Sequence, residues 1–143
     1  MEQLKNLKLN DFPATTYDKL RYGDTDKQGH VNNAVFTTFY ETGRVEIVYR
    51  PENGILDDGC SFVIANLQMN FIREIHWPGK LYIGTGITKV GNSSITFVQA
   101  LYQNDQLVST SASVLVQVSN DTKKSVPLSD AAKKRLQQYM INL

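Results

Sequence analysis

The spacing of the apolar residues changes once along this chain of 143 residues, and that change constrains the fold more than any other feature. Between residues 32 and 49 the apolar residues recur every three or four positions, as they do on one face of a helix. The members of this stripe are Val35, Phe36, Phe39, Tyr40, Gly43 and Ile47. Because glycine weakens a helix, we expect Gly43 to allow a close approach of the backbone. The spacing predicts a long helix over 32–49, which ends before Pro51.

From residue 61 onward the spacing shortens to two, which is typical of β-strands. One strand is expected over 61–71, and its alternating apolar residues are Val63, Ala65, Leu67, Met69 and Phe71. Further strands are expected over 79–91, 93–103 and 106–119, because Gly91-Asn92 and Asn104-Asp105 are typical of tight turns between strands. In the last of these strands one face carries Val108, Ala112, Val114, Val116 and Val118.

Two shorter segments complete the predicted fold. A strand over 13–23 precedes the long helix, and a closing helix over 127–140 is capped by Ser129. Strands joined by short hairpin loops form antiparallel sheets. We therefore expect a single α+β domain over 1–143, in which five to six antiparallel strands wrap around the long helix. One face of such a sheet stays uncovered, which indicates self-association.

The composition excludes several classes of protein. A net charge of +1 gives no broad attraction to nucleic acid or to membranes, and the apolar fraction of 41% is ordinary. The single cysteine, Cys60, has no partner for an internal disulfide, which fits a reducing compartment. The first residues lack the apolar core of a signal peptide, and no apolar run reaches the roughly 20 residues of a membrane span. We expect a cytoplasmic protein that binds neither nucleic acid nor membranes.

A dense polar cluster, GDTDKQGHVNN, lies just before the predicted helix. Asp24, Asp26 and Gly29 fit three positions of a calcium-binding EF-hand loop, but the twelfth position is Val35, where a glutamate is required. The EF-hand interpretation is therefore rejected. A zinc site is disfavoured as well, because the strong zinc ligands of the chain have no recognised spacing. These ligands are His30, Cys60 and His76.

A carboxylate beside a helix N-terminus has a chemical use. Free N–H groups and the positive end of the helix dipole stabilise an oxyanion that develops on a carbonyl. The carboxylate can attack that carbonyl or activate a water to do so. His30 is placed to orient this carboxylate or share a proton, and Asn32 or Asn33 to cap the helix and line the site. Alternatively, Asp24 and Asp26 only end a strand and cap a helix, and spacing alone leaves both interpretations open.

The segment RYGDTDKQGHVNNAVFTTFYETGR resembles the opening of hotdog-fold acyl-CoA thioesterases of the 4-hydroxybenzoyl-CoA thioesterase type. It is also similar to the acyl-carrier-protein thioesterases, whose pattern is Asp-x-Asp, then His-Val-Asn-Asn, then Tyr and Glu. The later segment NFIREIHWPGKLYIGTGITKVGNSSITF resembles the family's Pro-Gly before a strand and its Gly-x-Ser-Ser turn. The resemblance covers most of the chain and implies the hotdog fold, a long helix wrapped by an antiparallel sheet.

The resemblance also implies roles for particular residues. Asp26 matches the catalytic carboxylate, which serves as general base or nucleophile, and the backbone N–H of Asn33 or a neighbour would polarise the thioester carbonyl. His30 matches the histidine of the carrier-protein branch and favours a fatty acyl group, although Gln28 stands where that branch has an asparagine. By the same resemblance Glu74, in the segment FIRE, is a second carboxylate.

Substrate-binding residues are expected around this centre. Asn32 would line it, and the resemblance suggests that Ser93 and Ser94 lie near the pantetheine channel. Tyr40 is expected either to shape an acyl pocket or to pack in the core. Hydrolysis of a thioester requires no cofactor and no metal. Because the family's active sites lie between protomers, we expect a homo-oligomer, either a dimer or a tetramer.

Three functions are weighed on the sequence. The leading hypothesis is hydrolysis of an acyl-CoA with a fatty acyl group to the free acid and CoA, with acyl-carrier-protein thioesters as an alternative substrate. The second is an acyl-CoA-binding protein without turnover, a regulator that normally has an attached DNA-binding element, for which the residues before the first strand leave no room. The third is a dehydratase, whose helix entry is poorly matched by GHVNN.

Overall fold

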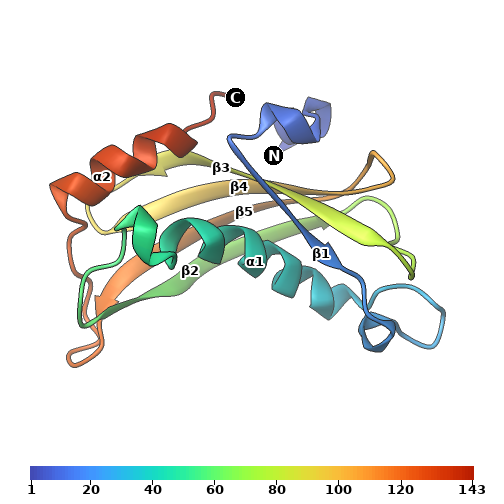
Figure 1. Cartoon of the computed structure of the whole chain (residues 1–143), viewed down its shortest axis with the longest axis horizontal. Helices are drawn as coiled ribbons and strands as arrows, with labels where there is room; N and C mark the ends of the chain where they lie inside the picture. Colours follow the sequence, from blue (N-terminus) through green and yellow to red (C-terminus); the bar gives the residue numbers. More distant parts are fainter.

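The computed structural model describes residues 1–143 and consists of one antiparallel sheet that carries a long helix on one face (Figure 1). Across the sheet the strands follow the order β1-β3-β4-β5-β2. The strands are β1 Ala14–Lys19, β2 Cys60–Phe71, β3 Lys80–Val90, β4 Ser94–Gln103 and β5 Gln106–Ser119. The helices are α1 Phe36–Val48 and α2 Asp130–Leu136. This arrangement confirms the predicted α+β class and the predicted wrapping of a helix by a sheet.

The long helix begins with one 3₁₀ turn over Asn33–Val35, so the chain is helical from residue 33 to residue 48. The side chain of Asn32 accepts a hydrogen bond from the backbone N–H of Ala34 at 3.0 Å and caps this turn. Most of the predicted apolar stripe is buried against the sheet, including Phe36 and Ile47. The helix therefore has a fixed start, which sets where its free N–H groups point.

Helix α1 is held on the sheet by a buried polar contact as well as by apolar packing. The amide of Gln99, on β4, donates hydrogen bonds of 3.0 Å to the carbonyl oxygen of Tyr40 and to Thr85 Oγ1. Its oxygen accepts a bond of 3.2 Å from Arg44 Nη1. A Cβ at Gly43 would lie 2.6 Å from both the Gln99 amide and the Thr85 hydroxyl. The predicted close approach at Gly43 is confirmed, since a larger residue would separate the helix from this contact.

The alternation predicted for the strand over 61–71 is wrong in part. The pairing of β2 with β5 shifts its register between Ile64 and Asn66. A bulge of this kind inserts one residue and reverses the faces beyond it, so Val63 lies on the face opposite to Leu67 and Met69. Nothing in the spacing of apolar residues marks the bulge, which is why the sequence assigns all of them to one face.

The valine face predicted for the strand over 106–119 is wrong in part: Val108 lies beside a shift in the pairing of β4 with β5 and packs in the cluster beneath α1, whereas Val114 and Val116 lie on the side of the sheet away from α1. The face of β5 that carries α1 has buried polar residues instead: Ser109, Ser111, Ser113 and Gln117. The hydroxyl oxygens of Ser111 and Ser113 are buried and make no hydrogen bond. On the outer face the segment before β1 packs in a cluster of Leu4, Phe12, Val98, Ala100 and Tyr102. Beyond Val108, the valines of β5 thus mark the outer side of the sheet rather than the contact with the helix.

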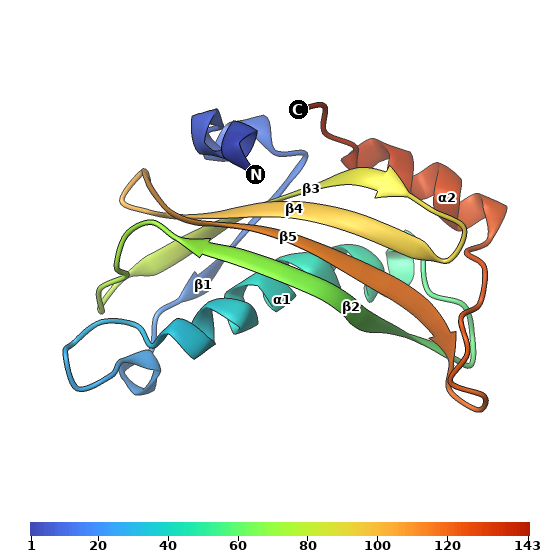
Figure 2. The same ribbon diagram turned by 180° about the vertical axis from the view of Figure 1, so that it is seen from behind.

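The predicted turns and the closing helix are confirmed. Asn104 and Asp105 join β4 to β5 with positive φ angles of 51° and 63°, as a two-residue hairpin turn requires. The Ser129 hydroxyl accepts a hydrogen bond from the N–H of Ala132 and caps α2, which contacts β3 and shares an apolar cluster with the last turn of α1. Figure 2 shows β2 as an outermost strand with no element of the chain beyond it. Neither helix is long and apolar enough to cross a membrane.

Candidate active site

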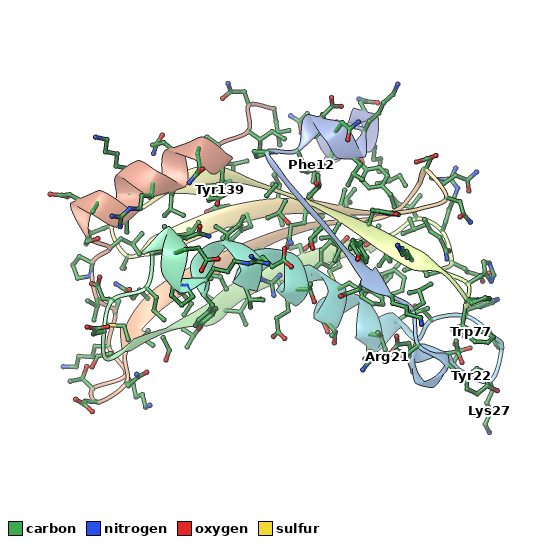
Figure 3. All side chains as sticks on the ribbon, in the orientation of Figure 1. Phe12, Arg21, Tyr22, Lys27, Trp77 and Tyr139 are labelled. Atoms are coloured by element: carbon green, nitrogen blue, oxygen red, sulfur yellow. The ribbon has the colours of Figure 1, made fainter.

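Two loops meet at the end of the sheet where α1 begins. One loop joins β1 to α1, and the other joins β2 to β3. Single bridges connect Thr25 to Val31 within the first loop and His30 to His76 between the two loops. The N–H of Val31 also donates to the carbonyl oxygen of Ile75 at 2.8 Å. Figure 3 shows side chains of both loops gathered at this end, where Tyr22 and Trp77 stack edge to face with ring centroids 5.3 Å apart.

The two aspartates of the first loop are in opposite environments. Asp24 is 5% exposed, and its carboxylate accepts bonds from the backbone N–H of Arg21 at 3.0 Å and from the guanidinium of Arg21 at 3.2 Å. Asp26 is exposed, and its Oδ1 accepts bonds from the N–H groups of Gln28 at 2.8 Å and His30 at 3.3 Å. The Oδ2 atom of Asp26 makes no hydrogen bond within the chain. Asp24 therefore holds the turn together, whereas Asp26 is oriented by two N–H groups and keeps one oxygen free.

A histidine and a glutamate from different loops form a pair beside Asp26. His30 Nε2 lies 3.0 Å from Glu74 Oε2, and the His30 side chain is 26% exposed. His76 reaches the same glutamate oxygen at 3.8 Å, and its ring packs edge to face on His30 with centroids 5.1 Å apart. The carboxylate of Glu74 thus fixes the orientation of the His30 ring, and a histidine so oriented can hold or pass a proton.

The start of the helix contributes an unpaired N–H group. Asn33 is the first residue of the 3₁₀ turn, and its backbone N–H makes no hydrogen bond within the chain. The next N–H group, that of Ala34, is already taken by the side chain of Asn32. One donor therefore stays free at the positive end of the helix dipole, where a developing negative charge is stabilised.

These groups line one hollow of about 310 Å³. Four of the residues predicted to be catalytic lie on its wall: Asp26, His30, Asn33 and Glu74. The structure brings them together from two loops that are more than forty positions apart in the sequence. The apolar part of the wall comes from Val31, Phe36, Phe71 and Ile72. The wall of the hollow therefore combines Asp26, which has a free carboxylate oxygen, and Asn33, which has a free N–H group, with apolar side chains.

Three other predicted residues do not reach this hollow within one chain. Tyr40 is fully buried, and its hydroxyl donates to Ser109 Oγ at 2.6 Å beneath the helix. Burial raises the pKa of Tyr40 above its ordinary value, so the phenol stays protonated. Ser93 and Ser94 lie at the start of β4, whereas the candidate site adjoins its last residue, Gln103, which bonds to His76 at both backbone atoms. Asn32 lies next to the hollow as the helix cap.

Sequence reasoning missed several residues of the hollow. Phe36 and Phe71 pack edge to face with centroids 5.0 Å apart, and Arg73 adds a positive charge to the wall. Phe36 belongs to the predicted apolar stripe, so its place at the start of the helix is the one signal available. No pattern around His76 points to the site, and only the bridge to His30 reveals that it stands beside the hollow. No group of three His, Cys, Asp or Glu side chains converges closely enough to hold a metal ion.

The fold is that of the hotdog thioesterases, a class in which a long helix is wrapped by an antiparallel sheet. The chain belongs to the thioesterase-like superfamily, whose family model matches residues 20–136. The matched region begins just before the polar loop and ends with α2, so it contains every residue of the hollow.

Relatives of known name are similar to the chain over most of its length. An acyl-CoA thioester hydrolase, YbgC of Escherichia coli, is 26% identical over 114 residues, which cover 78% of this chain and 82% of that protein. A predicted thioesterase from Bacillus stearothermophilus superposes with a TM-score of 0.80 at 27% identity, covering 88% of this chain and 95% of the other. A thioesterase from Thermus thermophilus, solved with coenzyme A and zinc, superposes with a TM-score of 0.76 at 26% identity, covering 89% and 93%.

Proposed function

We propose that the chain hydrolyses acyl-CoA thioesters to the free acid and CoA, with Asp26 at the centre of the reaction. The observation that carries this proposal is the hollow that collects Asp26, His30, Asn33 and Glu74 from two loops. Membership of a thioesterase family supports the reaction class, and the similarity to an acyl-CoA thioester hydrolase supports CoA thioesters as substrates.

In the first form of the mechanism Asp26 acts as general base. Its free Oδ2 takes a proton from a water, and the water oxygen attacks the thioester carbonyl carbon. The carbonyl oxygen becomes negative and accepts a hydrogen bond from the free N–H of Asn33. The C–S bond then breaks, and the thiolate of CoA leaves with a proton. A positioned base typically contributes about 10²–10⁴-fold, and one oxyanion donor about 10²–10³-fold.

In the second form Asp26 acts as nucleophile. Its Oδ2 attacks the carbonyl carbon and forms an acyl anhydride as the thiolate leaves, and water then hydrolyses the anhydride. Both forms use the same free oxygen and the same N–H of Asn33. The backbone N–H of His30 donates to the Asp26 carboxylate at 3.3 Å, and the contact of its ring with Glu74 at 3.0 Å keeps the ring in place to hold or pass a proton.

The acyl group is proposed to be fatty. The hollow has apolar side chains on the same wall as Asp26, and those of Phe36 and Phe71 pack edge to face. An apolar acyl chain gains free energy when it leaves water for such a surface, at about 25 cal/mol per Å². We propose acyl-CoA as the substrate, and an acyl-carrier protein remains the alternative carrier of the same thioester.

The active form is proposed to be a homo-oligomer, a dimer or a tetramer. Strand β2 is twelve residues long and forms an edge of the sheet, and Ile64 and Phe71 on it are 48% and 50% exposed. Long apolar strand edges are surfaces that pair with another chain. Ser93 and Ser94 lie at the far end of β4, so they can serve a site of this kind only from a second subunit.

The test is the release of free thiol from a panel of acyl-CoAs of short, long and aromatic acyl groups. Asp26→Asn is expected to lower kcat/KM by at least about 10²-fold while the melting temperature stays unchanged. The matched control is Asp58→Asn, an exposed aspartate outside the hollow, which should leave turnover intact. Activity that survives Asp26→Asn would move the chemistry to another residue. Tight binding of an acyl-CoA without hydrolysis would indicate a carrier or sensor instead.

A further inference from the structure

A buried positive charge in the middle of α1 has no carboxylate partner in the chain. Arg44 is 6% exposed, and its one hydrogen bond goes to the neutral amide of Gln99. The ion pairs of the chain involve other residues. Burial lowers the pKa of Arg44, and Glu41 opposes that effect from a distance. A buried charge without a charged partner is costly, so a negative group beside Arg44 would stabilise the molecule.

Arg44 lies on the flank of α1 that faces away from β1. Glu46 marks the opposite flank, because its carboxylate accepts a bond from Thr16 of β1 at 3.0 Å and pairs with Arg50. Two residues along a helix turn by about 200°, so Arg44 points away from Glu46 and towards the β2 side. Glu41 stands three residues before Arg44 and shares its flank. Glu41 is exposed and forms no ion pair within the chain.

This flank continues into the uncovered edge of the sheet. Helix α1 contacts β1, β3 and β4 and reaches β2 near the two ends of that strand, where Phe36 packs on Phe71 and Tyr49, just after the helix, packs on Phe62. Strand β2 is the outermost strand, so no other strand of the chain covers its edge (Figures 1 and 2). Ile64 and Phe71 are exposed there, and beside them Ser111 and Ser113 keep unpaired hydroxyl groups. One side of the molecule therefore carries three features together: the apolar edge strand β2, the exposed Glu41 without an ion pair, and the buried Arg44 without a carboxylate partner.

We propose that a second copy of this chain covers that side, and that Glu41 of each subunit forms an ion pair with Arg44 of the partner subunit. The proposal rests on the homo-oligomer proposed above and names the charges that specify it. In a dimer with two-fold symmetry each contact occurs twice, so one glutamate and one arginine per chain suffice for two identical pairs. Each pair supplies the negative charge that Arg44 lacks in a single chain.

The positions of the two charges fit a two-fold axis. Thr42 and Gly43 are at the middle of α1, which runs from residue 36 to residue 48. An axis between these two residues sets the helices antiparallel and brings Glu41 opposite Arg44 of the partner subunit. The same axis can pass the middle of β2, so that two edge strands pair antiparallel along their full length. Helix contact and strand contact are thus compatible with one symmetry operation.

The test is charge reversal, read out as the dimer dissociation constant by sedimentation velocity. A close pair of opposite charges at an interface typically contributes at least about tenfold to Kd, and the symmetry repeats the pair. Glu41→Arg is therefore expected to raise Kd by about 100-fold. The double variant Glu41→Arg with Arg44→Glu restores opposite charges and is expected to return to within about threefold of the wild type. Glu52→Arg, on the β1 side of the helix, is the matched control and should leave Kd unchanged.

Arg44→Glu alone places an acid in a buried position and can unfold the chain, so the conclusion does not rest on it. Glu41→Gln is exposed and isosteric, and it is expected to raise Kd by about tenfold and to weaken its salt dependence. A wild-type dimer that Glu41→Arg and Glu41→Gln leave intact would overturn the ion pair. A monomeric wild type would overturn both the pair and the oligomer. Neither result depends on thiol release, so hydrolysis by the hollow is tested separately.

Discussion

The start of α1 and the middle of α1 carry polar groups in opposite states. At the start, the Oδ2 of Asp26 and the N–H of Asn33 have no partner in the chain, and both residues line a hollow. In the middle, the amide of Gln99 is fully buried and uses its donors and its acceptor on Tyr40, Thr85 and Arg44. Saturated polar groups fix the helix on the sheet, whereas free ones remain available to a ligand. Substitutions in the two regions should therefore affect different measurements.

The largest effect on stability is expected in the middle of the helix. Gly43→Ala places a Cβ 2.6 Å from Gln99 and Thr85, so the helix must move off the sheet or the amide must leave its partners. Overpacking of this kind typically costs about 1–3 kcal/mol, which exceeds the gain of about 0.5–1 kcal/mol from alanine in a helix. Chemical denaturation measures the loss. Gly23→Ala is the control, since a Cβ there meets nothing within 4 Å. Equal stability of the two variants would contradict the close packing at Gly43.

The next effect is expected at the start of the helix and on turnover alone. His30→Gln removes the ring that Glu74 orients beside Asp26, and we expect kcat/KM to fall about tenfold, or about 1.4 kcal/mol in the barrier. The melting temperature should not change, because the His30 side chain lies in the partly open hollow. His76→Gln is the control: its ring is more exposed and lies 3.8 Å from Glu74, so turnover should change less than threefold. A larger loss in the control would place the proton-handling group on His76.

A smaller effect, on both stability and turnover, is expected at the cap of the first turn of the helix. Asn32→Ala removes the cap of the first turn, which typically costs about 1 kcal/mol of stability. Because the same turn holds the free N–H of Asn33, turnover should fall together with stability. Ser129→Ala removes the equivalent cap of α2 at the other end of the sheet and should cost similar stability without loss of turnover. Melting curves and thiol release on both variants make this comparison, and full turnover in Asn32→Ala would separate the cap from the chemistry.

The smallest effect is expected for Tyr40→Phe, which tests whether this tyrosine binds substrate. The change leaves Ser109 without a donor and should cost about 0.5–1.5 kcal/mol, with KM unchanged. The raised pKa of Tyr40 adds a signature at high pH. Above the ordinary tyrosine pKa of about 10 the unfolded chain releases a proton that the folded chain keeps, so stability falls as pH rises. Tyr40→Phe should reduce this loss of stability at high pH. An altered KM would instead indicate that Tyr40 contacts the acyl group.

The sequence predicted the elements because their signals are local. The stripe over 32–49, the Asn104-Asp105 turn and the Ser129 cap each follow from neighbouring residues, and the structure contains all three. The residues on each face of β2 and β5 could not be predicted from the sequence. In β2 a bulge after Ile64 reverses the faces, and in β5 buried serines stand where apolar residues were expected to face the helix. Periodicity records which residues alternate, and it does not record which face receives the helix.

The candidate site divides in the same way. Asp26 and Asn33 lie within eight positions of each other, and their place at a helix start was predictable from the loop between them. Glu74 was selected by family resemblance, and no local pattern points to its contact with His30 at 3.0 Å. Arg44 was missed altogether, because a charged residue three positions after Glu41 is ordinary for an exposed helix face. Its burial depends on the sheet that folds beneath it.

Gln103 has a consequence for the shape of the hollow. Its side-chain amide accepts from the N–H of His76 at 3.0 Å and donates to the carbonyl oxygen of the same residue at 2.7 Å. This is the pattern by which one strand holds its neighbour, carried out by a side chain instead of a backbone. The loop that bears Glu74 is therefore fastened like an additional strand, although it has none of a strand's regularity. The sheet therefore fixes the distance between Glu74 and His30, and the site is preorganised before a ligand binds.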